Sequence, residues 1–90
     1  RALATGLVSE VVEDDRLEAV AQAYVDDMLL ASPMGLRMTK EGLGLAVDAA
    51  SLEAAIAIEN RNQLITSRSP NFAEGMAAFI EKRRPVYAPD

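Results

Sequence analysis

Capping residues and prolines divide residues 14–84 into four segments, each with apolar side chains at the three- and four-residue spacing of an amphipathic helix. Ser32 and Pro33 end the first segment and open the second, because serine suits a helix cap and proline suits the first helical turn. Residues 67–70 interrupt the third segment, and Pro85 stops the fourth. These helix boundaries restrict the chain to a mainly α fold. The expected helices cover approximately residues 17–29, 34–47, 52–65, and 72 or 74 to 83.

Polar residues stand where these helices are expected to begin. Asp14 or Asp15 is placed to cap the first helix, and Ser51 is placed to cap the third. Asn71, followed three residues later by Glu74, has the arrangement of a capping box, in which the cap side chain and the glutamate each bind a backbone amide. We therefore expect the fourth helix to begin at this pair.

A short run of β-branched residues, residues 7–12, precedes the helices and predicts one strand. Gly6 stands where a helix that began upstream of Arg1 would end. No second strand follows, so we expect the hydrogen-bond partner of this strand to lie outside these residues. The alternative is an ordered extended arm. We accordingly assign residues 1–12 to the end of a core and residues 13–90 to a C-terminal helical segment.

Composition limits the chemistry that is open to this chain. Its 90 residues include no cysteine and no histidine, which excludes disulfides, thiol nucleophiles, a Ser-His-Asp triad and a tetrahedral zinc site. Fourteen acidic against nine basic residues give a net charge of −5, which argues against nucleic-acid binding. Charged residues interrupt every apolar run before the roughly 18 residues that a membrane span needs. The lack of disulfides fits a reducing cytoplasm, where we expect the protein to act.

Candidate catalytic groups are few. The adjacent carboxylates at positions 14–15 and 26–27 point about 100° apart on a helix, so neither pair forms an acid-base site. The serines have no base to activate them. We therefore predict no catalytic residue and no metal ligand within this chain.

One basic run, residues 82–84, suggests an anion site, and Arg68 is a candidate to join it across a turn. Phe79 and Lys82 are three residues apart on the expected last helix and would share a face. An aromatic ring beside an ammonium suits a nucleotide, with the ring against the base and the charge against a phosphate. Two other interpretations stay open, namely cations that favour the helix dipole and a Phe79 that belongs to a core.

Three strings in the sequence resemble the C-terminal third of the enoyl-CoA hydratase/isomerase (crotonase) family. They are residues 6–12 (GLVSEVV), residues 31–40 (ASPMGLRMTK) and above all residues 74–85 (EGMAAFIEKRRP). The resemblance covers essentially the whole chain in one order. It implies that residues 1–12 end a core of ββα units that these residues do not include. The helices would then be the trimerisation region that also covers the active site.

Further expectations follow from this resemblance alone. In the family the absent core holds the oxyanion hole and the acid-base carboxylates. Phe79 and Lys82 look like the family positions that approach the adenine and phosphate end of coenzyme A, often across a subunit boundary, and Lys40 looks like a recurrent structural lysine that pairs with a carboxylate or helix end. No tightly bound cofactor is implied, since the coenzyme A thioester is the substrate. The expected partners are the protein's own N-terminal core, further copies in a trimer or dimer of trimers, and an acyl-CoA of fatty acid metabolism.

The sequence thus predicts the C-terminal part of a crotonase-like acyl-CoA enzyme, an enoyl-CoA hydratase or isomerase, which itself lacks the catalytic core. The alternative is a free-standing acidic helical module that binds a protein partner without catalysis.

Overall fold

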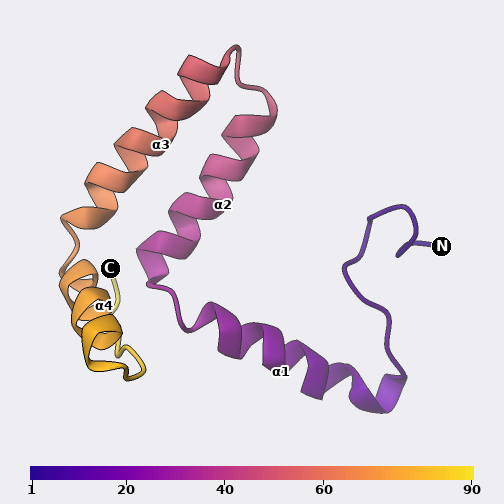
Figure 1. The fold of residues 1–90 in the computed structure, drawn as a ribbon. Helices are drawn as coiled ribbons and strands as arrows, with labels where there is room; N and C mark the ends of the chain where they lie inside the picture. Colours follow the sequence, from indigo (N-terminus) through magenta and orange to yellow (C-terminus); the bar gives the residue numbers. More distant parts are fainter.

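Four helices account for the regular structure in the computed structural model, which describes all 90 residues (Figure 1). A short 3-10 turn, η1 (Asp14–Arg16), leads into α1 (Leu17–Met28). Three further helices follow: α2 (Pro33–Val47), α3 (Leu52–Ser67) and α4 (Pro70–Glu81). α2 and α3 lie side by side as a helical hairpin, while α1 and α4 extend from the open end of that hairpin. The expected mainly α class is confirmed.

Local capping fixes the starts of three helices. The Ser32 hydroxyl accepts from the Gly35 amide at 3.0 Å, and the Ser51 hydroxyl accepts from the Ala54 amide at 3.1 Å, as expected. α4 begins differently, because its cap is Ser69, whose hydroxyl accepts from the amide of Asn71 at 3.2 Å. The predicted capping box is therefore wrong, since the side chains of Asn71 and Glu74 bind residues beyond the helix.

The start of α1 also differs from expectation. Neither Asp14 nor Asp15 caps it, because both belong to η1 and the cap position is Arg16, which makes no side-chain cap bond.

The predicted N-terminal strand is absent, and residues 7–12 run as an irregular arm. A strand needs the backbone of a neighbour, and none of these residues supplies one. The helix end expected before Gly6 is seen in its closing hydrogen bonds. The Leu7 amide donates to the Ala2 carbonyl at 2.9 Å and the Gly6 amide donates to the Leu3 carbonyl at 3.1 Å, with Gly6 at a φ of 78°, which is the bonding pattern of a glycine that ends a helix. The arm is held to α1 by the Tyr24 hydroxyl, which donates to the Glu10 carboxylate at 2.9 Å.

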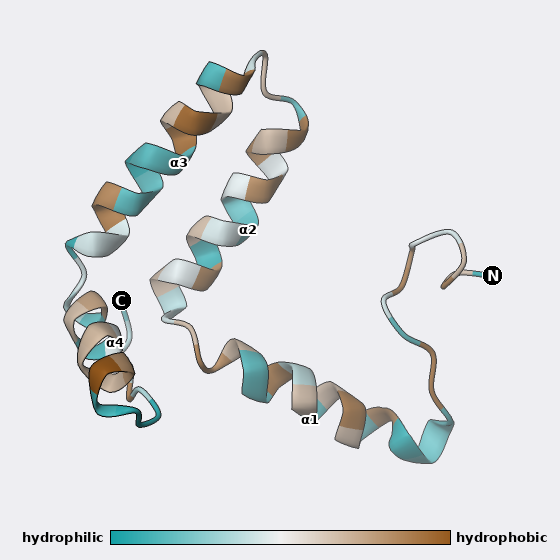
Figure 2. Cartoon of the chain, in the orientation of Figure 1, coloured by the Kyte–Doolittle hydropathy of each residue, from teal (hydrophilic) through white to brown (hydrophobic).

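Most of the apolar surface of these helices is open. Only Ala78 and Asn71 are buried, and the accessible surface of 7499 Å² exceeds the about 5,100 Å² expected of a compact chain of this mass. The radius of gyration, 16.5 Å, likewise exceeds the about 12 Å of a compact domain. Figure 2 shows hydrophobic residues on all four helices. The helices thus leave apolar faces that nothing within these 90 residues covers.

None of the helices combines the length and apolar character that would be required to cross a bilayer.

Candidate functional site

The two predicted nucleotide-binding residues lie at the C-terminal end of α4. Phe79 stands in the last turn with 81% of its surface exposed, so it is not a core residue of this chain. Lys82 is exposed and follows the helix rather than continuing it, because α4 ends at Glu81 and not at Arg83. Its φ of 54° and ψ of 44° are left-handed, and its amide donates to the Phe79 carbonyl at 3.3 Å. The two residues are therefore neighbours across a helix end, not partners on one helical face.

Arg83, the middle residue of the basic run, is fully engaged by carboxylates. Its Nη1 and Nη2 lie 2.5 and 3.1 Å from the two carboxylate oxygens of Glu74, and its Nε lies 2.6 Å from Glu81. These hydrogen bonds raise the pKa of the guanidinium, with the Glu74 bond as the largest cause. The Arg83 hydrogen bond, helped by the Val86 amide, lowers the pKa of Glu74 from its ordinary 4.5 to about 2. The charge of Arg83 is therefore neutralised within α4.

The remaining cations of the predicted anion site separate into two places. Lys82 and Arg84 make no side-chain hydrogen bond or ion pair within the chain, so their charges face outward. Arg68 lies at the C-cap of α3, just before α4 begins, and is thus separated from Lys82 by a helix about 18 Å long. The prediction that Arg68 joins the basic run is wrong.

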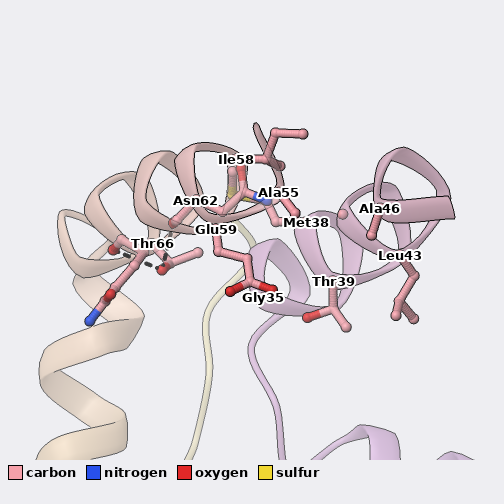
Figure 3. Close-up of a pocket in the computed structure, with 12 residues that line it drawn as sticks. Gly35, Met38, Thr39, Leu43, Ala46, Ala55, Ile58, Glu59, Asn62 and Thr66 are labelled. Carbon is pink, nitrogen blue, oxygen red and sulfur yellow. Dashed lines mark hydrogen bonds between the residues drawn. The ribbon is translucent and has the colours of Figure 1, made fainter. Parts of the chain in front are cut away.

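A cavity with a volume of about 400 Å³ lies between α2 and α3 (Figure 3). Apolar side chains such as Met38 and Ile58 line part of it, and polar side chains from α3, among them Glu59 and Asn62, line another part. At Gly42 of α2 an added Cβ would lie 3.4 Å from the side-chain nitrogen of Asn62 on α3, which is close to ordinary van der Waals contact. The sequence pattern did not predict this cavity.

Lys40 stands on α2 and makes no ion pair within the chain. Its neighbour Glu41 pairs instead with Arg61 of α3, at 3.7 Å. No group of three or more acidic side chains gathers where it could hold a metal ion.

The polar contacts around the C-terminal tail had no counterpart among the residues predicted from the sequence. Asn71 exchanges two hydrogen bonds with the backbone of Ala88, and Asp90 binds residues at the starts of α2 and α4. No local spacing signals these contacts, because the partners are 17 to 56 residues apart in sequence.

Known proteins share this sequence along nearly its whole length. The family model described as Enoyl-CoA hydratase/isomerase matches residues 1–89. The chain is 39% identical over 85 residues to "Mevalonyl-coenzyme A hydratase sidH" of Aspergillus fumigatus, and this match covers 93% of the chain and 32% of that protein. It is 40% identical over 86 residues to "Probable enoyl-CoA hydratase EchA12" of Mycobacterium tuberculosis, and this match covers 94% of the chain and 30% of that protein. The chain therefore belongs to the enoyl-CoA hydratase/isomerase family.

A solved structure shares the arrangement of the helices as well. The crystal structure of an enoyl-CoA hydratase/isomerase from Mycobacterium paratuberculosis superposes with a TM-score of 0.83 at 33% identity, covering 100% of this chain and 35% of that one. The chain thus spans about a third of the length of the relatives that it matches. Its open arrangement of helices is that of a helical segment within a larger crotonase-like fold.

Proposed function

We propose that this chain serves an acyl-CoA enzyme, an enoyl-CoA hydratase or isomerase, as its C-terminal helical segment, and that Phe79 and Lys82 contact the nucleotide end of coenzyme A. Family membership supports the class of enzyme and favours it over a free-standing acidic interaction module. The chemistry would reside outside these residues, where an oxyanion hole polarises the thioester carbonyl and carboxylates transfer protons. We place this activity in fatty acid metabolism in the cytoplasm.

The backbone of Lys82 is the observation that carries the nucleotide contact. Lys82 is the only non-glycine residue with a positive φ. Glycine adopts this helix-ending conformation freely, whereas a residue with a Cβ incurs a cost of about 1 to 2 kcal/mol. A lysine at such a position is consistent with a use for its ammonium, which stands one turn from the exposed ring of Phe79. Ring and charge are the two groups that a base and a phosphate require.

Exposed apolar surface supports a second part of the proposal, that α1 and α4 pack on the enzyme's own core and on further copies. Several large apolar side chains are at least half exposed. They are Leu17 at the start of α1, Leu29 just after its end, and Phe72 and Ile80 on α4. Side chains of this size are usually covered in a stable protein. The assembly proposed is a trimer or a dimer of trimers, and sedimentation of the full-length protein tests it, because a monomer that does not change on dilution would contradict it.

The nucleotide contact is tested with Lys82→Ala in the full-length enzyme. Because the phosphate lies far from the reacting carbons, the contact binds ground and transition states alike, so KM for an acyl-CoA should rise up to about tenfold to a hundredfold while kcat changes little. The matched acyl-pantetheine thioester lacks the nucleotide and should show no change.

Arg84→Ala is the control, because it removes one exposed charge two residues away. An equal loss for Lys82→Ala on both substrates, no loss on either, or the same loss for Arg84→Ala would contradict a specific contact between Lys82 and the nucleotide.

A further inference from the structure

The last five residues, 86–90, run back along α4 toward its start (Figure 1), and we call them the strap. The Val86 amide donates to Glu74 at 2.9 Å, near the middle of α4. Two residues on, the Ala88 amide donates to the Asn71 side-chain oxygen at 2.9 Å, and the Asn71 amide group donates to the Ala88 carbonyl at 2.6 Å. The strap therefore binds α4 at successive points from its middle to its first turn.

Asp90 then joins α4 to α2. One carboxylate oxygen accepts from the Ser69 hydroxyl at 2.5 Å, at the cap of α4, and the other accepts from the Met34 amide at 2.8 Å, in the first turn of α2. The Arg37 guanidinium, also on α2, donates to the backbone oxygen of Asp90. The Ser69 bond is the largest cause of a lowered Asp90 pKa, so the side chain is held as a carboxylate. One side chain thus binds both Met34 and Ser69, which are 35 residues apart in sequence and stand at the beginnings of two helices.

Few other contacts fix α4 relative to α2. α2 and α3 are the only two α-helices in extended contact, and α4 packs along neither of them. By contrast, Asn71, which binds the strap, is one of the two buried residues of the chain. The strap also lies close against α4 at Gly75, where an added Cβ would come within 3.2 Å of the Tyr87 hydroxyl. The direction of α4 from the hairpin therefore depends on the strap and on the short connection after Ser67.

We propose that the strap is a conformational device that holds α4 at a fixed orientation to α2, and that Asp90 is the positioning residue that closes it. The Phe79–Lys82 end of α4 is consequently held in place from the opposite end of the helix. This second consequence, the placement of a nucleotide-binding surface, rests on the proposed function, whereas the strap itself does not.

Amide hydrogen exchange of the full-length protein tests the strap without any ligand. Asp90→Ala should speed the exchange of the first turn of α2 and of α4 by about tenfold or more, and should leave α1 unchanged, because two acceptors to these elements are lost. Asp90→Asn should have a smaller effect, since its amide keeps an acceptor for the Met34 amide and offers donors to Ser69. Asp48→Ala is the matched control, because Asp48 is exposed and makes no side-chain bond. If the exchange rates are unchanged in Asp90→Ala, or change equally in Asp48→Ala, the proposal that the strap holds α4 relative to α2 is contradicted.

Kinetics of the same variants test the positioning role. Asp90→Ala should raise KM for an acyl-CoA by less than Lys82→Ala does, with kcat and the acyl-pantetheine reaction unchanged, and Asp90→Asn should restore part of the loss. Faster exchange without a change in KM, while Lys82→Ala raises KM, would overturn the positioning role and leave the strap and the nucleotide contact intact. If Lys82→Ala also leaves KM unchanged, the proposed function fails and the strap stands on the exchange data alone.

Discussion

Arg83 folds back on α4 so that its guanidinium meets the carboxylate of Glu74 through two hydrogen bonds, of 2.5 and 3.1 Å. The residues are nine apart, which is too far for a contact along one straight helix face. The left-handed Lys82 between them reverses the chain and makes the pairing possible. The same Glu74 oxygen that binds Arg83 Nη1 also accepts from the Val86 amide at 2.9 Å. This carboxylate therefore fixes both the end of α4 and the beginning of the strap.

Glu74→Gln should lower the melting temperature of the full-length protein at neutral pH. The pKa of Glu74 is depressed from 4.5 to about 2, so its contribution to stability is fully present above about pH 4.5 and is lost as the pH falls toward 2. The difference in melting temperature between wild type and Glu74→Gln should consequently be constant from pH 6 to 8 and shrink below pH 4.5. It should also shrink in high salt, because the Arg83 side chain is 38% exposed. A difference that grows on acidification would contradict this account.

Local signals predicted the parts of the fold that depend on neighbours in sequence. Ser32 and Ser51 cap the helices that their positions indicated, because a cap needs only the amides three residues on. Gly6 has the positive φ expected of it. The capping box at Asn71 and Glu74 failed for the opposite reason. The Asn71 side chain binds the backbone of Ala88, and the Glu74 carboxylate binds Arg83, instead of the first amides of the helix. Both partners lie beyond the helix, so a rule based on local spacing cannot predict them.

The two residues of the candidate site were selected from the sequence, and their binding role stays a prediction, but their geometry could not be selected in the same way. Phe79 and Lys82 were found from an aromatic residue and a cation at short spacing, and the structure places both at the exposed end of α4. Spacing implied one helical face, whereas Lys82 leaves the helix in a left-handed conformation that sequence propensity disfavours. Asp90 carried no signal at all, because its importance comes from contacts with Met34 and Ser69 that only the tertiary arrangement creates.

Ser32 and Gly35 should show strong coupling in a double-mutant cycle. Ser32→Ala loses a cap worth about 1 kcal/mol of folding free energy. Gly35→Ala gains helix propensity of about 1 kcal/mol, but its Cβ would lie only 3.0 Å from the Ser32 hydroxyl and would displace the cap. Gly35→Ala should therefore be nearly neutral in the wild type and stabilising in Ser32→Ala, as measured by chemical denaturation. Additive effects would show that the hydroxyl accommodates the methyl group without losing its bond.

Gly75 and Gly44 form a matched pair for testing how closely the strap packs. Both are helical, but a Cβ at Gly75 would meet the Tyr87 hydroxyl at 3.2 Å, whereas a Cβ at Gly44 meets nothing within 4 Å in this chain. Gly44→Ala should stabilise the protein by about 1 kcal/mol through helix propensity alone. Gly75→Ala should give clearly less, because the Tyr87 ring must shift, and Tyr87→Ala should restore the full gain. Equal gains for both glycines in the wild type would mean that the ring moves freely.

Lys82→Gly should separate the stability of the helix end from its proposed binding role. Glycine adopts the left-handed conformation of Lys82 without steric cost, so this variant should stabilise the full-length protein by about 1 kcal/mol. The variant also removes the ammonium, so KM for an acyl-CoA should rise as much as in Lys82→Ala. Stability and substrate binding would then change in opposite directions, which excludes general damage to α4 as the cause of the weaker binding.

Lys82→Ala is the control for this comparison, because alanine lacks the ammonium but still has a Cβ in the left-handed conformation. It should share the rise in KM and show no gain in melting temperature. If Lys82→Gly is stabilised while KM stays at the wild-type value in both variants, the lysine conformation has no connection with coenzyme A. If Lys82→Gly and Lys82→Ala melt together, the left-handed backbone costs nothing here, and the structural support for a retained ammonium is lost.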